Sequence, residues 1–291
     1  MKLSPEQIRE FEAAGVLIVP VFDPEDLQPL KDEISGFVDQ YARSAQKDGK
    51  ISELHEDKDF SHRMGYLMKE YPELSDPFDI CNLRGIEMFR FMAHPKLLET
   101  LSPLFDGEII CSSVQHIRVK PPIAFTDHGY SHFNVPWHQD SGVAQPESDA
   151  SLMVTVWCPL GPATAEMGCM RVIPGVRSHV VHESSDYGTR VRADLLPEAE
   201  PVVAECRDGE IVIMRQFTPH HSTPNRSSRC RWSMDLRYQK TGTPSARPWL
   251  PEFVVASKSR PETIFNDYES WCAQWENPPP KPEHLSNHRI G

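Results

Sequence analysis

The sequence lacks long apolar runs and an excess of basic charge. No segment approaches the roughly 20 consecutive apolar residues of a membrane-spanning helix, and the charged N-terminal segment has no apolar signal-peptide core. The 30 Lys and Arg residues are outnumbered by 42 Asp and Glu residues, which gives a net charge of −12. Because phosphate contacts need a basic surface, we expect no nucleic-acid partner and no adhesion to anionic membranes.

Paired cysteine motifs are missing as well. The seven cysteines are odd in number and widely spaced, and no two of them form a C-x-x-C pair. This pattern argues against a disulfide framework and against a zinc knuckle, and it suits reduced thiols. We therefore expect a soluble cytoplasmic protein whose cysteines are small buried apolar residues.

The first third of the chain reads as helical. Capping signals and apolar spacing predict a helix over 4–14, a short strand over 16–19 and a longer amphipathic helix over 24–41. Residues 45–80 are charged and less periodic, which predicts irregular structure. One more helix is expected over 95–105.

From about residue 109 the pattern changes to short β-type runs separated by Gly, Pro, Asp and Ser clusters. These runs are 109–110, 114–119, 152–157, 170–173, 202–203, 211–214 and 232–238. They favour a sandwich or barrel over βαβ units, and the 27 prolines make a helical bundle unfavourable.

We predict one mainly β domain over 1–291. It comprises a helical part over 1–108, a β core over 109–240 and a C-terminal extension over 241–291, with a short helix around 264–276.

The segment Trp137-His138-Gln139-Asp140 contains the first chemical signal. On an extended segment, side chains alternate with period two, so His138 and Asp140 would point to a common centre. His220 offers a third ligand downstream. Two histidines and one carboxylate form the facial triad of non-haem Fe(II) oxygenases. His-x-Asp is common by chance, however, and a surface pair or a buried polar pair is the ordinary alternative.

The segment after His220 strengthens this interpretation. Arg231 lies eleven residues beyond His220, a hairpin distance, which predicts a strand with a metal ligand, a turn and a returning strand with an inward arginine. A guanidinium can hold a carboxylate through two parallel hydrogen bonds. His221 is an alternative ligand, but alternation along the strand favours His220.

With these motifs the chain resembles the phytanoyl-CoA dioxygenase family of Fe(II)/2-oxoglutarate-dependent oxygenases. The resemblance rests on 137–140, on Gly168–Gly175 with His179, and on the run from His220 to Arg231. It implies a double-stranded β-helix, a cupin-like jelly roll, with Fe(II), 2-oxoglutarate and O2 as cofactor and co-substrates. The residue roles that it implies are iron ligation by His138, Asp140 and His220, anchoring of the 2-oxoglutarate C5 carboxylate by Arg231 with Ser222, and co-substrate contacts by Trp157 and Gln115.

The resemblance also implies the reaction. 2-Oxoglutarate is converted to succinate and CO2, and a C–H bond of the substrate is oxidised. Related halogenases lack the carboxylate ligand, so Asp140 favours hydroxylation, desaturation or ring chemistry. The segment Pro174-Gly-Val-Arg-Ser-His179 departs from the family's shorter Pro-Gly-Ser-His, and this affects a turn rather than the ligands.

Other interpretations remain open. A cupin-type isomerase or hydrolase would have no use for Arg231 at this spacing, and a non-catalytic binding module would usually have lost a ligand. His128 and His132 could suggest a zinc pair, but their surroundings favour a loop. His116 reads as a strand residue without a chemical role. The aromatic residues of the C-terminal extension read as packing residues.

The substrate is not specified by these motifs. Segments 55–90 and 121–135 and the C-terminal extension would surround the barrel mouth and suit a medium-sized, partly polar small molecule. Hydroxylation in specialised metabolism is our expectation, by a monomer or homodimer. Residues 215–240 hold six basic residues against one acidic residue, a local charge that would attract a dicarboxylate.

Overall fold

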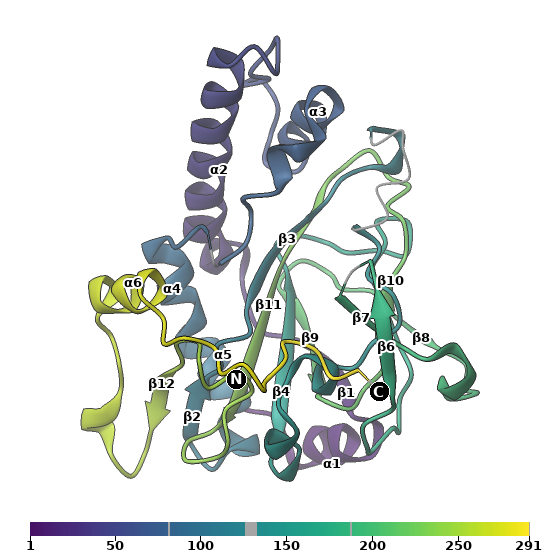
Figure 1. Cartoon of the computed structure of the whole chain (residues 1–291), viewed down its shortest axis with the longest axis vertical. Helices are drawn as coiled ribbons and strands as arrows, with labels where there is room; N and C mark the ends of the chain where they lie inside the picture. Colours follow the sequence, from purple (N-terminus) through teal and green to yellow (C-terminus); the bar gives the residue numbers. More distant parts are fainter. Residues whose placement is uncertain (81, 126–132, 187, 291) are drawn as a thin grey trace.

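The computed structural model describes residues 1–80, 82–125, 133–186 and 188–290. Its described strands form antiparallel sheets with helices on the outside (Figure 1). The seven-stranded sheet contains, in spatial order, β1 (Val16–Pro20), β9 (Glu210–Arg215), β4 (Met153–Pro159), β11 (Arg231–Lys240), β2 (Glu108–Cys111) and β12 (Phe253–Ser257), with β3 (His116–Lys120) also paired to β11. A three-stranded sheet contains, in spatial order, β10 (His220–Ser222), β5 (Met170–Val172) and β8 (Val202–Ala204). A two-stranded sheet contains β6 (His182–Ser185) and β7 (Gly188–Val191).

Five of the six described α-helices lie before β2 in the chain, and α6 follows β12. The helices are α1 (Pro5–Ala14), α2 (Pro24–Lys47), α3 (Arg63–Glu70), α4 (Ile86–Met92), α5 (Pro95–Leu101) and α6 (Tyr268–Glu276). The predicted start of α1 is confirmed, because the Ser4 hydroxyl accepts a hydrogen bond from the Gln7 backbone and the Gln7 side chain accepts one from Ser4 N. Gly15 ends the helix with a φ of 74°, a left-handed conformation that glycine adopts without steric cost.

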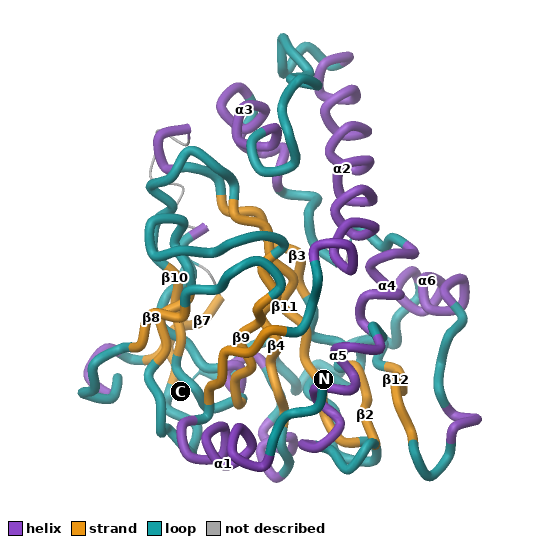
Figure 2. The backbone as a smooth tube through the Cα atoms, turned by 180° about the vertical axis from the view of Figure 1, so that it is seen from behind, coloured by secondary structure: helices purple, strands orange, loops and turns teal. Residues whose placement is uncertain are grey.

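The seven-stranded sheet is buried on both faces. Along β4, Val154 and Val156 join the core that includes the apolar side chains of α2, α4 and α5. Trp157, which points to the other face, packs instead with Val172 of the three-stranded sheet. Figures 1 and 2 show the same layers, with α2, α4 and α6 on one side of the sheet and β6, β7, β8 and β10 on the other. Two facing antiparallel sheets confirm the mainly β, jelly-roll prediction.

The helical part contains more order than the sequence predicts. α2 continues to Lys47, and α3 lies within the 45–80 segment that was expected to be irregular. The buried side chains of α3 include Met64, Leu67 and Met68, at spacings of three and four residues. This apolar stripe is only two turns long, so the charged residues around it hid the periodicity. α4 was not predicted either.

The expectation of a hairpin between His220 and Arg231 is wrong. β10 belongs to the three-stranded sheet and pairs with β5, whereas β11 belongs to the seven-stranded sheet and pairs with β3, β4 and β2. The eight residues between these strands, 223–230, therefore pass from one sheet to the other. His220 and Arg231 lie on facing sheets, which places a space between them.

The C-terminal extension adds β12 to the edge of the large sheet, a strand that the sequence did not predict. The expectation that its aromatic residues are packing residues is confirmed: Phe253, Trp271 and Trp275 are buried in the core with Phe89. Among the described residues, six cysteines are free and five of these are buried. No described helix has the length and apolar character needed to cross a membrane.

Candidate active site

The structure brings His138, Asp140 and His220 together between the two sheets. Their ligand atoms all lie within 4.8 Å of one another. His138 and His220 are held side by side by a pair of backbone hydrogen bonds, of 3.1 and 2.9 Å, in an isolated antiparallel bridge. The chain is extended only up to Gln139, because a 3-10 turn (Asp140–Val143) begins at Asp140. The three groups converge across two segments that are far apart in sequence.

Both imidazoles are oriented by backbone carbonyls. The Nδ1 atoms of His138 and His220 lie 2.9 Å from the carbonyl oxygens of Pro136 and Thr218. A carbonyl oxygen can only accept, so each Nδ1 carries a proton, and Nε2 is the atom that has the lone pair in the neutral ring. Burial and the neighbouring His220 hold the pKa of His138 well below its usual range, which favours its neutral form. A neutral imidazole with a free Nε2 atom is the form that binds a metal ion.

Asp140 is fully buried and is held as a carboxylate. Arg237 Nη2 donates to Asp140 Oδ1 over 2.5 Å, and the Thr155 hydroxyl donates to Oδ2. Burial by itself would raise the pKa of the Asp140 carboxyl, but the charge of Arg237 and the nearby imidazoles bring this pKa below its usual value. The sequence shows Arg237 only as one of the basic residues of 215–240, whereas in the structure it forms an ion pair with Asp140.

The residue between the ligands fixes the turn. The Gln139 amide nitrogen donates to the carbonyl oxygens of Phe217 and Ser178, at 2.6 and 3.0 Å, and its oxygen accepts from Val180 N at 2.7 Å. His179 lies 2.8 Å from the Ser141 hydroxyl. The loop 174–180, which departs from the family's shorter sequence, thus holds the turn that begins at Asp140.

Arg231 points into a cavity that also includes His138 and His220 in its lining. Its side chain is buried, and no described residue accepts a hydrogen bond from its Nε or Nη1. The guanidinium carbon lies 4.9 Å from the centre of the Trp157 ring, which is also buried. An unsatisfied buried guanidinium is costly, and an anionic ligand in this cavity would satisfy it.

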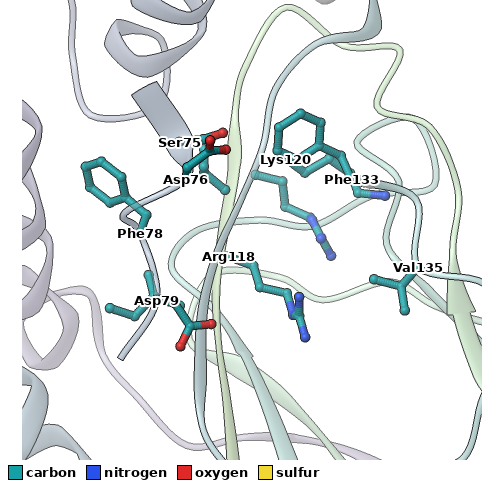
Figure 3. A pocket seen from close by; sticks show the side chains of 11 residues that line it. Ser75, Asp76, Phe78, Asp79, Arg118, Lys120, Phe133 and Val135 are labelled. Atoms are coloured by element: carbon teal, nitrogen blue, oxygen red, sulfur yellow. The ribbon is translucent and has the colours of Figure 1, made fainter. Parts of the chain in front are cut away.

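Lys120 is a second buried basic residue, next to Arg231 and at an adjoining pocket, that sequence reasoning missed. It lies opposite Arg231 in the β3–β11 register, and its Nζ donates to the Ser222 hydroxyl at 2.8 Å and to the Thr223 carbonyl at 2.5 Å. Burial and the charge of Arg231 lower the pKa of Lys120 to about 6. Figure 3 shows Lys120 and Arg118 projecting to the same side of β3, as residues two apart in a strand do. A lysine inside a buried strand was the signal available in the sequence.

The remaining candidates lie elsewhere. The Gln115 amide donates to the Ser112 carbonyl at 2.6 Å, and Gln115 is not among the described residues that line this cavity. The His221 ring packs 4.0 Å from Trp137, and it is not part of the three-residue cluster. His128 and His132 fall outside the described residues. The amino acids present fit a non-haem iron centre, since the donor set is two histidines and one carboxylate.

The comparison with known families decides the assignment. The sequence profile of the phytanoyl-CoA dioxygenase family (PhyH) matches residues 11–233. The chain belongs to this family. It is a non-haem iron, 2-oxoglutarate-dependent enzyme, because the match covers most of the chain and the donor set is complete.

Solved structures with the fold of this PhyH-family chain include enzymes with diverse reactions. The non-haem monooxygenase ThoJ, in its apo form, is 17% identical, with a TM-score of 0.60 over 92% of this chain and 95% of its own. The epimerase SnoN, in complex with Fe3+, 2-oxoglutarate and nogalamycin RO, is 17% identical, with a TM-score of 0.54 over 82% and 84%. EvdO2 from Micromonospora carbonacea var. aurantiaca, complexed with 2-oxoglutarate, is 20% identical, with a TM-score of 0.50 over 86% and 98%.

Proposed function

We propose that the protein is an Fe(II)- and 2-oxoglutarate-dependent oxygenase that hydroxylates a C–H bond of a small organic molecule, and that this molecule belongs to specialised metabolism. The observation that carries the proposal is the buried guanidinium of Arg231, which faces the same cavity as the two histidines and has unsatisfied donors. A metal centre alone explains His138, Asp140 and His220, but it does not explain this cation.

Each residue then has a specific task. His138, Asp140 and His220 would hold Fe(II), which would supply the oxidation chemistry with 2-oxoglutarate and O2. Arg231 binds the distal carboxylate of 2-oxoglutarate, and Lys120 neutralises the same group while orienting the Ser222 hydroxyl.

The surrounding residues keep this co-substrate in place. Trp157 forms a flat wall beneath the guanidinium and excludes water from the ion pair. Arg237 keeps Asp140 ionised and fixes its orientation. The co-substrate therefore enters a site whose charges are already oriented.

The first experiment is anaerobic addition of Fe(II) and 2-oxoglutarate. The protein should develop a weak visible metal-to-ligand absorption, and His138→Ala should abolish it. His221→Ala is the matched control, since it removes the adjacent histidine that lies outside the cluster, and it should keep the band. Absence of the band in the unaltered protein would contradict the proposal.

The second experiment separates this activity from a metal-dependent isomerase or hydrolase. Succinate release is measured together with loss of each compound in a metabolite panel. In an oxygenase the two processes are coupled, and Arg231→Ala should reduce both while metal binding is retained. Full turnover by the Arg231→Ala variant would favour the isomerase or hydrolase.

A further inference from the structure

A second cavity reaches the metal ligands without contacting Arg231, Trp157 or Ser222. It encloses about 890 Å³, against about 410 Å³ for the cavity around Arg231, and both volumes include space open to solvent. Its lining includes His138 and Asp140 together with polar side chains from several other parts of the chain. These polar residues are Asp79, His116, Arg118, Thr189, Arg237, Arg247, Asn287 and His288, of which Arg118 and Arg237 also line the cavity around Arg231.

Two of the basic side chains at this cavity contact carboxylates. His116 Nδ1 lies 2.7 Å from Asp79 Oδ2, and Arg118 Nε lies 2.5 Å from Asp235 Oδ2. The described aliphatic lining is limited to Val135 and Val143. A lining that contains both donors and acceptors complements hydroxyl or amide groups, whereas a hydrocarbon chain would leave these polar groups desolvated.

The C-terminal segment 285–290 forms one side of this cavity. Figure 1 shows the yellow chain returning from α6 across the molecule to the region of β6 and β7. Asn287 and His288 line the cavity, and a Cβ on Gly188 would lie only 2.5 Å from His288 Nε2. β7 and this segment are therefore in close contact.

Arg289 holds the segment in place. Its backbone N donates to the Gly142 carbonyl at 2.8 Å, and its Nη1 donates to Asp149 Oδ2 at 2.8 Å and to the Ser141 carbonyl at 3.3 Å. Ser141 and Gly142 directly follow the metal ligand Asp140. The end of the chain is thus fastened to the turn that carries a ligand.

Two further bonds continue this attachment. The Gln145 amide donates to the Ser286 carbonyl at 2.8 Å, and Arg247 donates to the Asn287 carbonyl at 3.0 Å. Five residues outside the segment therefore hold it, although it has no helix or strand of its own. These hydrogen bonds fix the position of an irregular segment beside the cavity.

We propose that residues 285–290 form a wall of the primary-substrate site, in which Asn287 and His288 face a polar substrate bearing hydroxyl or amide groups. Arg289 is the positioning residue. The inference rests on the proposed oxygenase function and adds the class of substrate and the residues that select it.

The test compares Arg289→Ala and a deletion of residues 285–291 with the unaltered protein. Arg192→Ala is the matched control, because it removes an exposed arginine that donates two hydrogen bonds to Asp194 outside the cavity. Each protein is loaded anaerobically with Fe(II) and 2-oxoglutarate, and the rate at which bipyridyl removes the iron is measured.

We expect all four proteins to show the Fe(II)–2-oxoglutarate absorption. Iron removal should be several-fold faster for Arg289→Ala, faster still for the deletion and unchanged for Arg192→Ala. Equal rates of iron removal in all four proteins would overturn the proposal that residues 285–290 form a wall of the site. Loss of the absorption in the unaltered protein would instead overturn the oxygenase function, so the two failures are distinguishable.

A second probe tests the polarity of the site. A branched-chain acyl-CoA, added to the unaltered enzyme under air, should leave succinate release at its background rate because the cavity offers few apolar contacts. Stimulated release would show that the site accepts a hydrocarbon chain and would overturn the assigned substrate class.

Discussion

The two cavities beside the metal ligands are built in different ways. The one around Arg231 is lined largely by side chains of strands, and Lys120 lies next to it, opposite Arg231 in the adjacent strand. The other combines residues of β3, β7 and β11 with loops and the C-terminal segment, and Arg118, Val135, His138 and Arg237 line both cavities. The first has a buried guanidinium with unsatisfied donors, whereas His116 and Arg237, at the second, contact carboxylates.

This difference suggests that the co-substrate site is fixed, whereas the substrate site can vary among related enzymes. Strands position side chains to within a narrow range, which suits recognition of one small dicarboxylate. Loops tolerate insertions and substitutions, which suits a substrate that differs among related enzymes. The following predictions test this division, beginning with the largest expected effect.

Arg237→Met should destabilise the metal-free protein by about 3–5 kcal/mol, because it leaves the buried Asp140 carboxylate without its partner. Asp140 has a lowered pKa when folded, so its stabilisation is present above the usual carboxyl pKa and is lost as the pH falls below it. Thermal unfolding with and without a divalent metal measures the effect. The metal should restore part of the loss, and equal destabilisation in both conditions would contradict the pairing.

Arg231→Ala should weaken 2-oxoglutarate binding by about 2–5 kcal/mol, which is at least about thirtyfold in Kd. Arg231→Lys should recover only part of the affinity, because lysine cannot form two parallel bonds. Anaerobic titration of the absorption band measures the Kd of both variants. A Kd within twofold of the unaltered value would show that the dicarboxylate binds elsewhere.

Lys120 should make this binding depend on pH. Its pKa of about 6 in the free protein rises when a carboxylate binds, so a proton is taken up. Affinity for 2-oxoglutarate should therefore fall by up to about tenfold per pH unit above 6. Lys120→Gln should flatten this dependence. An equally steep profile in the variant would assign the proton to another group.

His116→Ala should change 2-oxoglutarate affinity by less than about twofold, because the residue lines only the other cavity. Substrate-coupled succinate release should nevertheless fall. The ratio of the two measurements is the useful quantity. A large loss of co-substrate affinity would mean that the two cavities act as one site.

The sequence identified the residues whose types and spacings define a chemical pattern. His138, Asp140, His220 and Arg231 could be found because imidazoles, a carboxylate and a guanidinium occur in a known order. The path of the chain between them could not be found, and the expected hairpin proved to be a crossing between sheets. A three-residue strand such as β10 carries too little periodicity to indicate its partner.

Residues that depend on distant contacts were also missed. Arg237 meets Asp140 across 97 positions, and Arg289 meets Asp149 across 140. Local propensity contains no information about such contacts, which form only when the sheets and the C-terminal segment pack. The predicted strand runs over 109–240 were largely correct because alternation is a local property.

One strand, β11, contributes residues to both cavities. Arg231, Asp235 and Arg237 lie an even number of positions apart and so share a face of the strand. There Asp235 pairs with Arg118, Arg237 pairs with Asp140, and Arg231 is the residue proposed to bind the co-substrate. A single-residue insertion or deletion between them would turn one arginine to the opposite face. Evolution can therefore exchange the loops and the C-terminal segment independently, while the spacing within β11 has to be inherited as one unit.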